Sequence, residues 1–302
     1  MRNAVVTGAT GFIGSWLARE LLDHKYDVTV IVRDKMRLMP GIIENCSVIE
    51  KPVEKISASD FNGKMDVFYH IAWEGVSCEH KNQFDIQLKN IGASLNVLDV
   101  AHSIGCGRFI ATGTVAEYAL CDNVMDMSSR QVPNDFYGAA KVSAHYFMEV
   151  RARQLGQSFI WCVVPSVFGE GRNGHNIITY TIQTLLRGEK PVYGNLQQMW
   201  DFLYVKDVVK ALRFIGERGK KNKVYGIGSG DYRTLKDYVC RIRDVINPAL
   251  PLGIGESSTW TKRTSSSCVN NYDLKKDTGF QPDFTFEEGI QRTVNYYEQQ
   301  LQ

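Results

Sequence analysis

The sequence predicts an α/β fold in which a doubly wound parallel sheet is accompanied by a smaller C-terminal lobe. Over the first two-thirds of the chain, short apolar runs alternate with amphipathic stretches, which is typical of β-α-β units and of a sheet covered on both faces. A glycine-rich turn directly follows the first apolar run. Beyond Pro165 the alternation stops, and glycines and prolines become frequent.

The apolar runs define the elements of the predicted sheet lobe. Strands are expected at Asn3–Thr7, Asp27–Val32, Asp66–Ile71, Arg108–Ala111 and Phe159–Val164, and helices at Gly11–His24, Asn82–Ile104 and Asn134–Leu155. Further helical patterns at Ile177–Arg187, Val205–Glu217, Leu235–Ile246 and Phe286–Gln300 come in no regular order with strands. We therefore expect a first domain over residues 1–165 and a second lobe mainly from residues 166–302, with some chain returning to the sheet.

Composition narrows the class of protein. The chain has 302 residues, of which 44% are hydrophobic and 23% charged, and its formal net charge is +2. Acids and bases are spread evenly, so no basic stripe for nucleic acid or anionic lipid is expected. No apolar run approaches the length of a membrane span. The seven cysteines never form a C-x-x-C pair, which favours free thiols and a cytoplasmic protein.

The glycine-rich turn has the spacing of a phosphate cradle. Gly8, Gly11 and Gly14 form a G-x-x-G-x-x-G run between the first strand and the first helix. Such glycines permit a tight turn and let backbone N–H groups approach a pyrophosphate at the helix N-terminus. The sequence therefore predicts a Rossmann-like dinucleotide site. Its expected contacts are Gly8, Thr10, Gly11, Phe12, Ile13 and Gly14.

The end of the second predicted strand bears on the choice of dinucleotide. Arg33 and Asp34 follow Val32 directly. A guanidinium suits the 2′-phosphate of NADP, whereas a carboxylate accepts hydrogen bonds from the ribose of NAD. Because Arg33 comes first, NADP(H) is the preferred cofactor, with NAD(H) as the alternative if Asp34 takes the ribose.

A tyrosine and a lysine four residues apart are the candidate catalytic pair. Tyr137 and Lys141 lie at i and i+4 of a predicted helix and hence on one face. A neighbouring ammonium stabilises a phenolate, so we expect the pKa of Tyr137 to be lowered toward the range of an acid–base catalyst. Lys141 can also hold the nicotinamide ribose.

A threonine past an inner strand is the expected third member. Thr114 follows the run Arg108–Ala111, and ligands in open α/β sheets sit beyond the carboxyl ends of strands. Its hydroxyl could orient a reacting carbonyl or alcohol. Thr112 is a competing candidate for this role.

With these motifs in this order, the chain resembles the NAD-dependent epimerase/dehydratase group of the extended short-chain dehydrogenase/reductase superfamily. Matching segments include His70–Ala72, Lys89–Gly92, Ser166–Gly171, Trp200–Val208 and Asp273–Lys276. The resemblance implies a Rossmann domain that binds NAD(P), a C-terminal lobe that binds a nucleotide-diphosphate sugar, and catalysis by Thr114, Tyr137 and Lys141. It further implies that Ala72, Thr112, Pro165 and Val167 contact the cofactor, together with Tyr137 and Lys141.

Two departures from the group concern substrate binding. Ser166 stands where relatives commonly have an asparagine, and Trp200 stands where they commonly have an arginine. Lys262 and Arg263 lie in a segment where an arginine of the group often binds the diphosphate, and Arg263 is assigned that role, with a solvated basic pair as the alternative. Trp73, Glu117, Ser166 and His175 are the other expected substrate contacts.

The residues after Thr114 narrow the reaction. Related 4,6-dehydratases have an acidic pair there, whereas this chain has Val115 and Ala116, so dehydration is not expected. The preferred function is NADPH-dependent reduction of a 4-keto sugar nucleotide. The alternatives are a nucleotide-sugar epimerase with tightly bound NAD, a reductase of a small non-sugar carbonyl, and a non-catalytic nucleotide sensor. No metal-ligand spacing is present, and a homodimer through the two long helices is expected by analogy.

Overall fold

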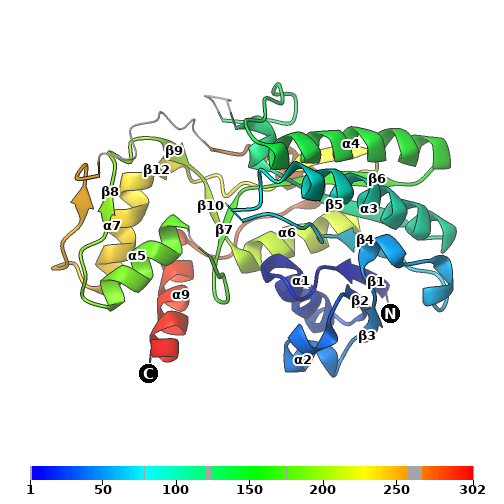
Figure 1. The fold of residues 1–302 in the computed structure, drawn as a ribbon, viewed down its shortest axis with the longest axis horizontal. Helices are drawn as coiled ribbons and strands as arrows, with labels where there is room; N and C mark the ends of the chain where they lie inside the picture. The colour runs from blue at the N-terminus through cyan, green and yellow to red at the C-terminus, as the bar shows by residue number, and fades with distance from the viewer. Residues whose placement is uncertain (1, 78, 120–123, 175, 258–266, 302) are drawn as a thin grey trace.

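In the computed structural model, a parallel sheet of seven strands forms the larger lobe (Figure 1). The structure describes residues 2–77, 79–119, 124–174, 176–257 and 267–301. The strand order is β3-β2-β1-β4-β5-β6-β11, so the order reverses between β1 and β4, where dinucleotides bind in folds of this type. The strands are β1 Arg2–Thr7, β2 Tyr26–Val32, β3 Ser47–Glu50, β4 Val67–His70, β5 Arg108–Thr114, β6 Phe159–Val164 and β11 Lys223–Gly226. The predicted fold class is confirmed.

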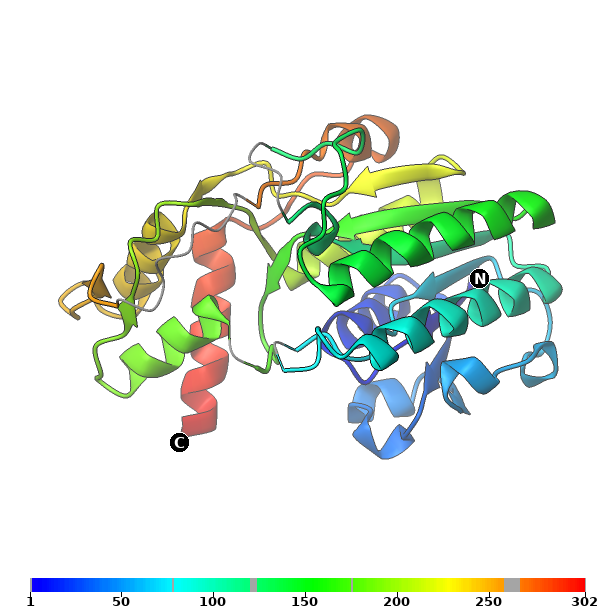
Figure 2. The ribbon, with the colours of Figure 1, turned by 45° about the horizontal axis from the view of Figure 1, so that its top comes forward.

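Helices cover both faces of the sheet (Figures 1 and 2). On one face α1 (Phe12–Asp23) packs beside α6 (Val205–Arg218), and on the other α3 (Phe84–Ser103) packs beside α4 (Phe136–Leu155). Helix α4 buries Ala140, Ala144, Met148 and Ala152 at four-residue spacing, which gives it a narrow apolar face against the sheet. It ends at Gly156, whose φ of 67° is the left-handed conformation that glycine adopts without a Cβ penalty.

The second half of the chain contributes to both lobes. Helix α6 and strand β11 return to the sheet, where β11 pairs with β6 in parallel from Lys223 opposite Ile160. Helix α8 (Tyr272–Thr278) holds this edge, because the Asp277 carboxylate accepts hydrogen bonds from Lys223 Nζ at 2.7 Å and from the Tyr225 hydroxyl at 2.9 Å. Burial alone would raise the pKa of Asp277, but bonds to Lys220, Lys223 and Tyr225 hold it well below the usual range.

The smaller lobe has its own apolar core. Helices α5 (Ile177–Leu186), α7 (Leu235–Ile246) and α9 (Phe286–Leu301) pack around Phe168, Phe202 and Tyr238. Short strands complete it: β7 Ser166–Phe168 with β10 Phe202–Tyr204, β9 Met199–Trp200 with β12 Arg233–Thr234, and β8 Val192–Tyr193 with β13 Gly253–Ile254. The remaining elements are α2 Pro40–Ile43 and the short 3-10 helices η1 Lys35–Arg37, η2 Val53–Lys55, η3 Ala58–Asp60 and η4 Val115–Tyr118.

Among the residues that the structure describes, no helix combines the length and the apolar composition that crossing a lipid bilayer requires. Within the same residues, no group of three or more His, Cys, Asp or Glu side chains is arranged to hold a metal ion.

Candidate active site

The glycine-rich turn connects β1 to α1 and is packed too tightly for side chains. Gly8 has φ of +75°, and a Cβ there would lie 3.0 Å from the backbone of Ala72 at the end of β4. A Cβ on Gly14 would lie 2.2 Å from the Gly8 carbonyl oxygen. Helix α1 begins after Gly11 with no acidic residue in its first turn and no side-chain cap. Its backbone N–H groups are therefore available for an anion such as a pyrophosphate.

A buried polar network fixes the ends of β1 and β4 beside this turn. The Thr7 hydroxyl accepts hydrogen bonds from the backbone N–H groups of Ile71 and Ala72, both at 3.0 Å, which leaves its own proton for His70 Nδ1 at 3.1 Å. His70 Nε2 then donates to Ser94 at 3.0 Å. Burial lowers the pKa of His70 to about 3, so the ring is neutral and serves as structural support.

At the tip of β2 the two residues that bear on cofactor choice are both engaged. The Arg33 guanidinium pairs with the Glu74 carboxylate at 3.2 Å, and both side chains are more than half exposed. The Asp34 carboxylate accepts a hydrogen bond from Met36 N at 2.9 Å and caps η1. The preference for NADP(H) assumes a free Arg33, but an acidic side chain stands beside it.

The three expected catalytic residues come together at the carboxyl edge of the sheet. Thr114 ends β5, and its hydroxyl is hydrogen-bonded to the phenol of Tyr137 in the first turn of α4. One turn further along α4, Lys141 Nζ donates to the backbone oxygen of Thr112 at 2.6 Å. Of the two candidate threonines, Thr114 therefore contacts Tyr137, whereas Thr112 anchors Lys141 through its carbonyl.

The predicted lowering of the Tyr137 pKa is wrong for this structure. Burial raises the pKa of Tyr137 to about 12, and the hydrogen bond from Thr114 only partly opposes this. Among the groups that most affect the pKa of Tyr137, the cation is Arg172 rather than Lys141. Lys141 is itself buried, which lowers its own pKa, and its ammonium faces Thr112 and aromatic rings. Sequence spacing placed the pair on one face correctly but could not report burial.

Two of the expected substrate contacts, Trp73 and Glu117, differ in where their side chains lie. Trp73 lies beside the expected catalytic residues, with its ring centroid 3.9 Å from Lys141 Nζ and 6.3 Å from the Tyr137 ring. Glu117, in contrast, is fully buried in η4, where it accepts a hydrogen bond from Thr114 N at 2.8 Å. The expectation that Glu117 touches substrate is therefore replaced by a position behind Thr114.

The two departures on the substrate side contact one another. Trp200 Nε1 donates to the Ser166 hydroxyl at 2.9 Å, so the residue in place of an arginine binds the residue in place of an asparagine. Ser166 and Val167 lie in β7, directly after Pro165 at the end of β6. This strand pairs with β10 and joins the sheet lobe to the smaller lobe (Figure 2). His175, Lys262 and Arg263 lie outside the described residues.

Arg172 is a functional candidate that the sequence reasoning missed. Its guanidinium lies 5.3 Å from the ring of Phe12 in the glycine-rich turn, and its backbone oxygen accepts a hydrogen bond from Tyr297 of α9. Its Nε is buried without a hydrogen-bond partner among the described residues. Burial lowers the pKa of Arg172, and the nearby Tyr137 phenol opposes that effect. A partly buried cation between the lobes, close to Tyr137, is suited to an anionic ligand.

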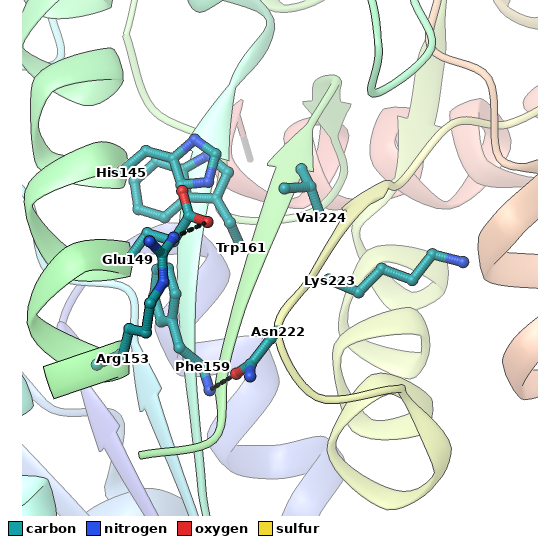
Figure 3. Close-up of a pocket in the computed structure, with 9 residues that line it drawn as sticks. His145, Glu149, Arg153, Phe159, Trp161, Asn222, Lys223 and Val224 are labelled. Carbon is teal, nitrogen blue, oxygen red and sulfur yellow. Dashed lines mark hydrogen bonds and ion pairs between the residues drawn. The ribbon is translucent and has the colours of Figure 1, made fainter. Parts of the chain in front are cut away.

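A small pocket elsewhere in the molecule does not belong to this site. Figure 3 shows it between α4 and the edge strand β11, lined by residues that include His145, Trp161 and Asn222. Thr114, Tyr137 and Lys141 are absent from its lining. Trp161 links the two places, because its ring faces this pocket while its Nε1 points to Glu117.

Comparison with known proteins agrees with this geometry. The profile of the NAD dependent epimerase/dehydratase family matches residues 4–228. The dTDP-glucose 4,6-dehydratase of Haemophilus influenzae is 26% identical over 98% of each chain, and the UDP-glucose 4-epimerase of Corynebacterium glutamicum is 24% identical over 93% of this chain and 91% of its own.

Solved structures share the fold over nearly the whole chain. The UDP-N-acetylglucosamine 4-epimerase of Methanobrevibacter ruminantium, solved in complex with UDP-N-acetylmuramic acid, has a TM-score of 0.88, 24% identity and coverage of 99% of both chains. The UDP-glucuronic acid 4-epimerase of Bacillus cereus, solved in complex with NAD, has a TM-score of 0.85, 18% identity and coverage of 99% of this chain and 100% of its own. The chain belongs to the NAD-dependent epimerase/dehydratase family and is an enzyme of the extended short-chain dehydrogenase/reductase type.

Proposed function

We propose that the protein catalyses hydride transfer at the ring carbon 4 of a nucleotide-diphosphate sugar, with NAD(H) as cofactor. The observation that carries this proposal is the contact between the Thr114 hydroxyl and the Tyr137 phenol at the carboxyl edge of the sheet, beside the glycine-rich turn. A threonine that orients an oxygen and a tyrosine that exchanges its proton are the groups that an alcohol–ketone interconversion requires.

Each residue then has a separate task. The glycine-rich turn would hold a nicotinamide dinucleotide, which would supply the hydride chemistry. Tyr137 moves a proton to or from the sugar oxygen, and Thr114 holds that oxygen by a hydrogen bond. Lys141, fixed by Thr112, holds the nicotinamide ribose, and Arg172 contacts an anionic group between the lobes.

Dehydration has no suitable acid and base in the described site. Val115 and Ala116 follow Thr114, and the carboxylate of η4, Glu117, is fully buried and turned toward Trp161. This favours simple oxidoreduction over removal of water, although several relatives are dehydratases.

The tip of β2 supports NAD(H) over NADP(H). Glu74 pairs with Arg33, and Asp34 lies next to it, so a 2′-phosphate would enter between two carboxylates. An exposed ion pair is weak, at about 0–1 kcal/mol, so Arg33 could still turn to a 2′-phosphate. Two reactions therefore compete: reduction of a 4-keto sugar nucleotide with exchange of the cofactor, and 4-epimerisation with retained NAD.

The two reactions differ in whether the cofactor leaves the protein after each turnover, and this difference can be measured. Purified protein would be denatured and the released nucleotide identified by mass. A second, native sample of the protein would be assayed with NADH, with NADPH and with no added cofactor. The substrates would be UDP-, dTDP-, GDP- and CDP-sugars and their 4-keto forms. Retained NAD with interconversion of 4-epimers indicates the epimerase, and consumption of added cofactor by a 4-keto substrate indicates the reductase.

The remaining alternatives give other outcomes in the same assay. Reduction of a small carbonyl that nucleotide diphosphates do not inhibit indicates a non-sugar reductase. Cofactor binding without turnover on any substrate indicates a sensor. Tyr137→Phe is the matched control, because it removes the proton but keeps the ring; unchanged turnover in this variant would refute the mechanism.

We also infer a homodimer through α3 and α4. These two helices pack side by side and expose large apolar side chains: Phe84 and Leu88 on α3, and Phe136, Tyr146, Phe147 and Val150 on α4. A second copy of the chain would cover them in a bundle of four helices. Light scattering should give twice the mass of the chain, and Phe147→Glu should reduce it to one chain; a monomeric parent would exclude the dimer.

A cytoplasmic location is proposed on the state of the cysteines. Cys46, Cys106, Cys162, Cys240 and Cys268 carry free thiols. Free thiols persist where the compartment is reducing. Fractionation of the source cells with an antibody to the protein tests this location.

A further inference from the structure

The ammonium of Lys141 is enclosed almost entirely by groups of the protein. Only 4% of the residue is exposed, and its one described hydrogen bond goes to the Thr112 carbonyl at 2.6 Å. The ring of Trp73 covers it at 3.9 Å from Nζ to the centroid, and Trp161 lies further away at 5.8 Å. The face of an indole attracts a cation, and this attraction is strongest where water is excluded. Aromatic faces therefore replace part of the water that Lys141 has lost.

Trp73 is held in this position from behind. Its Nε1 donates to Gln87 Oε1 at 2.9 Å, and Gln87 Nε2 donates in turn to Gly75 O at 2.8 Å. Gln87 lies on α3 and is buried, so the indole is fixed to the helix that flanks the site. The edge-on contact of Trp73 with Tyr137, at 75° between the ring planes, places the same indole against both catalytic side chains of α4.

A buried carboxylate, Glu117, shares a neighbour with the lysine, because both lie beside the indole of Trp161. Glu117 has no exposed surface, and its oxygens accept hydrogen bonds from Thr114 N at 2.8 Å, Gln131 Nε2 at 2.9 Å and Trp161 Nε1 at 3.3 Å. Room for these groups depends on Gly113, where a Cβ would lie 2.2 Å from Trp161 Nε1 and 2.4 Å from Glu117 Oε1. His145 stacks on Trp161 with the ring centroids 4.8 Å apart (Figure 3). The carboxylate is thus held by an indole that is itself fixed.

Glu117 and Lys141 carry opposite charges, and each influences the ionisation of the other. Burial raises the pKa of Glu117 and lowers that of Lys141, whereas their mutual attraction favours the charged form of each. The other titratable groups that face them are His70 from β4, which is neutral, the phenol of Tyr137 from α4, and the phenol of Tyr118 from η4. Glu117 is therefore the group that can compensate the buried ammonium.

We propose that Trp73 and Glu117 are positioning residues that keep Lys141 protonated and fixed one turn from Tyr137. The inference rests on the proposed function only in giving Lys141 a role in turnover; the enclosure itself does not depend on the substrate. Without the Glu117 charge, burial favours the neutral amine, so the midpoint of Lys141 titration moves to lower pH. Loss of the Trp73 ring face acts in the same direction.

Two matched pairs of variants test the two contacts separately. Glu117→Gln removes the charge, and Glu117→Asp keeps it on a shorter side chain. Trp73→Leu removes the ring face, and Trp73→Phe keeps it but loses the indole N–H. Thermal unfolding would reveal whether Glu117→Gln fails to fold. In that case the two Trp73 variants remain informative, because they change no charge.

The measurement reads Lys141 directly, without substrate. Nitrogen NMR of the full chain labelled at its lysine side chains follows each ammonium across pH 6–10, and the Lys141 signal is assigned by its loss in Lys141→Arg. Glu117→Gln and Trp73→Leu should lower the Lys141 midpoint by about one pH unit or more, whereas Glu117→Asp and Trp73→Phe should restore most of it. An unchanged midpoint in both Glu117→Gln and Trp73→Leu overturns the proposal.

Failure of the proposed function gives a different result. If no redox turnover is found but the Lys141 midpoint shifts as expected, the positioning inference stands and the assigned reaction is wrong. If turnover is found, its alkaline limb should move to lower pH in Trp73→Leu but not in Trp73→Phe. A purely structural role for Trp73 would lower the melting temperature without moving that limb.

Discussion

Replacing Gly14 by alanine tests the packing of the glycine-rich turn, because the substitution has two opposing effects on the free energy of unfolding. Gly14 lies inside α1, where alanine is intrinsically favoured over glycine by about 0.5–1 kcal/mol. Its Cβ, however, would lie 2.2 Å from the Gly8 oxygen and 2.7 Å from the Gly8 carbonyl carbon. Non-bonded heavy atoms rest at roughly 3.5–4.0 Å, so the turn and the helix must separate by about 1 Å or more.

The clash should outweigh the gain in helix propensity. Overpacking costs about 1–3 kcal/mol, so a net loss of about 1–2 kcal/mol of unfolding free energy is expected. The same movement displaces the backbone N–H groups that we propose for binding a pyrophosphate. Loss of one hydrogen bond to a charged group, about 1.5–3 kcal/mol, weakens the affinity for NAD(H) by about ten- to a hundredfold.

Urea unfolding and calorimetric titration with NADH measure the two effects. Gly41→Ala is the control, because it lies in α2 with no heavy atom within 4 Å of its added Cβ. That variant should be as stable as the parent or slightly more so, with unchanged affinity. If Gly14→Ala matched Gly41→Ala in both measurements, the turn would not be packed against the helix as described, and the anion site would lose its support.

Three other side chains should respond in defined ways. Arg172→Gln should raise the pKa of Tyr137 and move its limb of the pH–rate profile to higher pH, while weakening the nucleotide sugar in a KM measurement; a limb that stays in place contradicts the coupling. Ser166→Ala leaves the Trp200 indole N–H without its 2.9 Å partner and should cost about 1–3 kcal/mol in urea unfolding, which Ser166→Thr should largely spare. Asp277→Asn should lower stability at pH 7, and because the folded-state pKa of Asp277 is depressed, the difference from the parent should shrink below about pH 4; a difference independent of pH would refute this.

The parts of the fold that follow local pattern were predictable. Strands β1, β2, β4, β5 and β6 and the long helices lie where apolar periodicity placed them, within a few residues. Strand β5 runs on to Thr114 because Gly113 and Thr114 pair with Val163 and Val164 of β6, a contact that sequence pattern does not contain. The edge strands β3 and β11 were missed, since each is short and partly exposed and forms only by pairing with a longer neighbour.

The meeting of the expected catalytic residues was predictable from the sequence, but their electrostatics were less so. The order of the glycine turn, Thr114, Tyr137 and Lys141 identified the residues that meet. Burial of Tyr137 and the proximity of Arg172 depend on contacts between segments far apart in the chain, so the direction of the Tyr137 pKa shift could not be read from a spacing of four residues. The sequence suggested that Glu117 contacts substrate, because nothing in the sequence around this carboxylate indicates that it is buried.

The return of the chain to the sheet at β11 has a consequence for synthesis. Strand β6 has its outer neighbour only after residue 226 has been made, and α6 must come back to lie beside α1. A nascent or truncated chain that stops near residue 165 would expose the apolar edge of β6 while still attached to the ribosome, where strand edges recruit other chains. Fragments prepared for crystallisation or screening should therefore extend at least through β11, and a split at the lobe junction is expected to yield aggregated material.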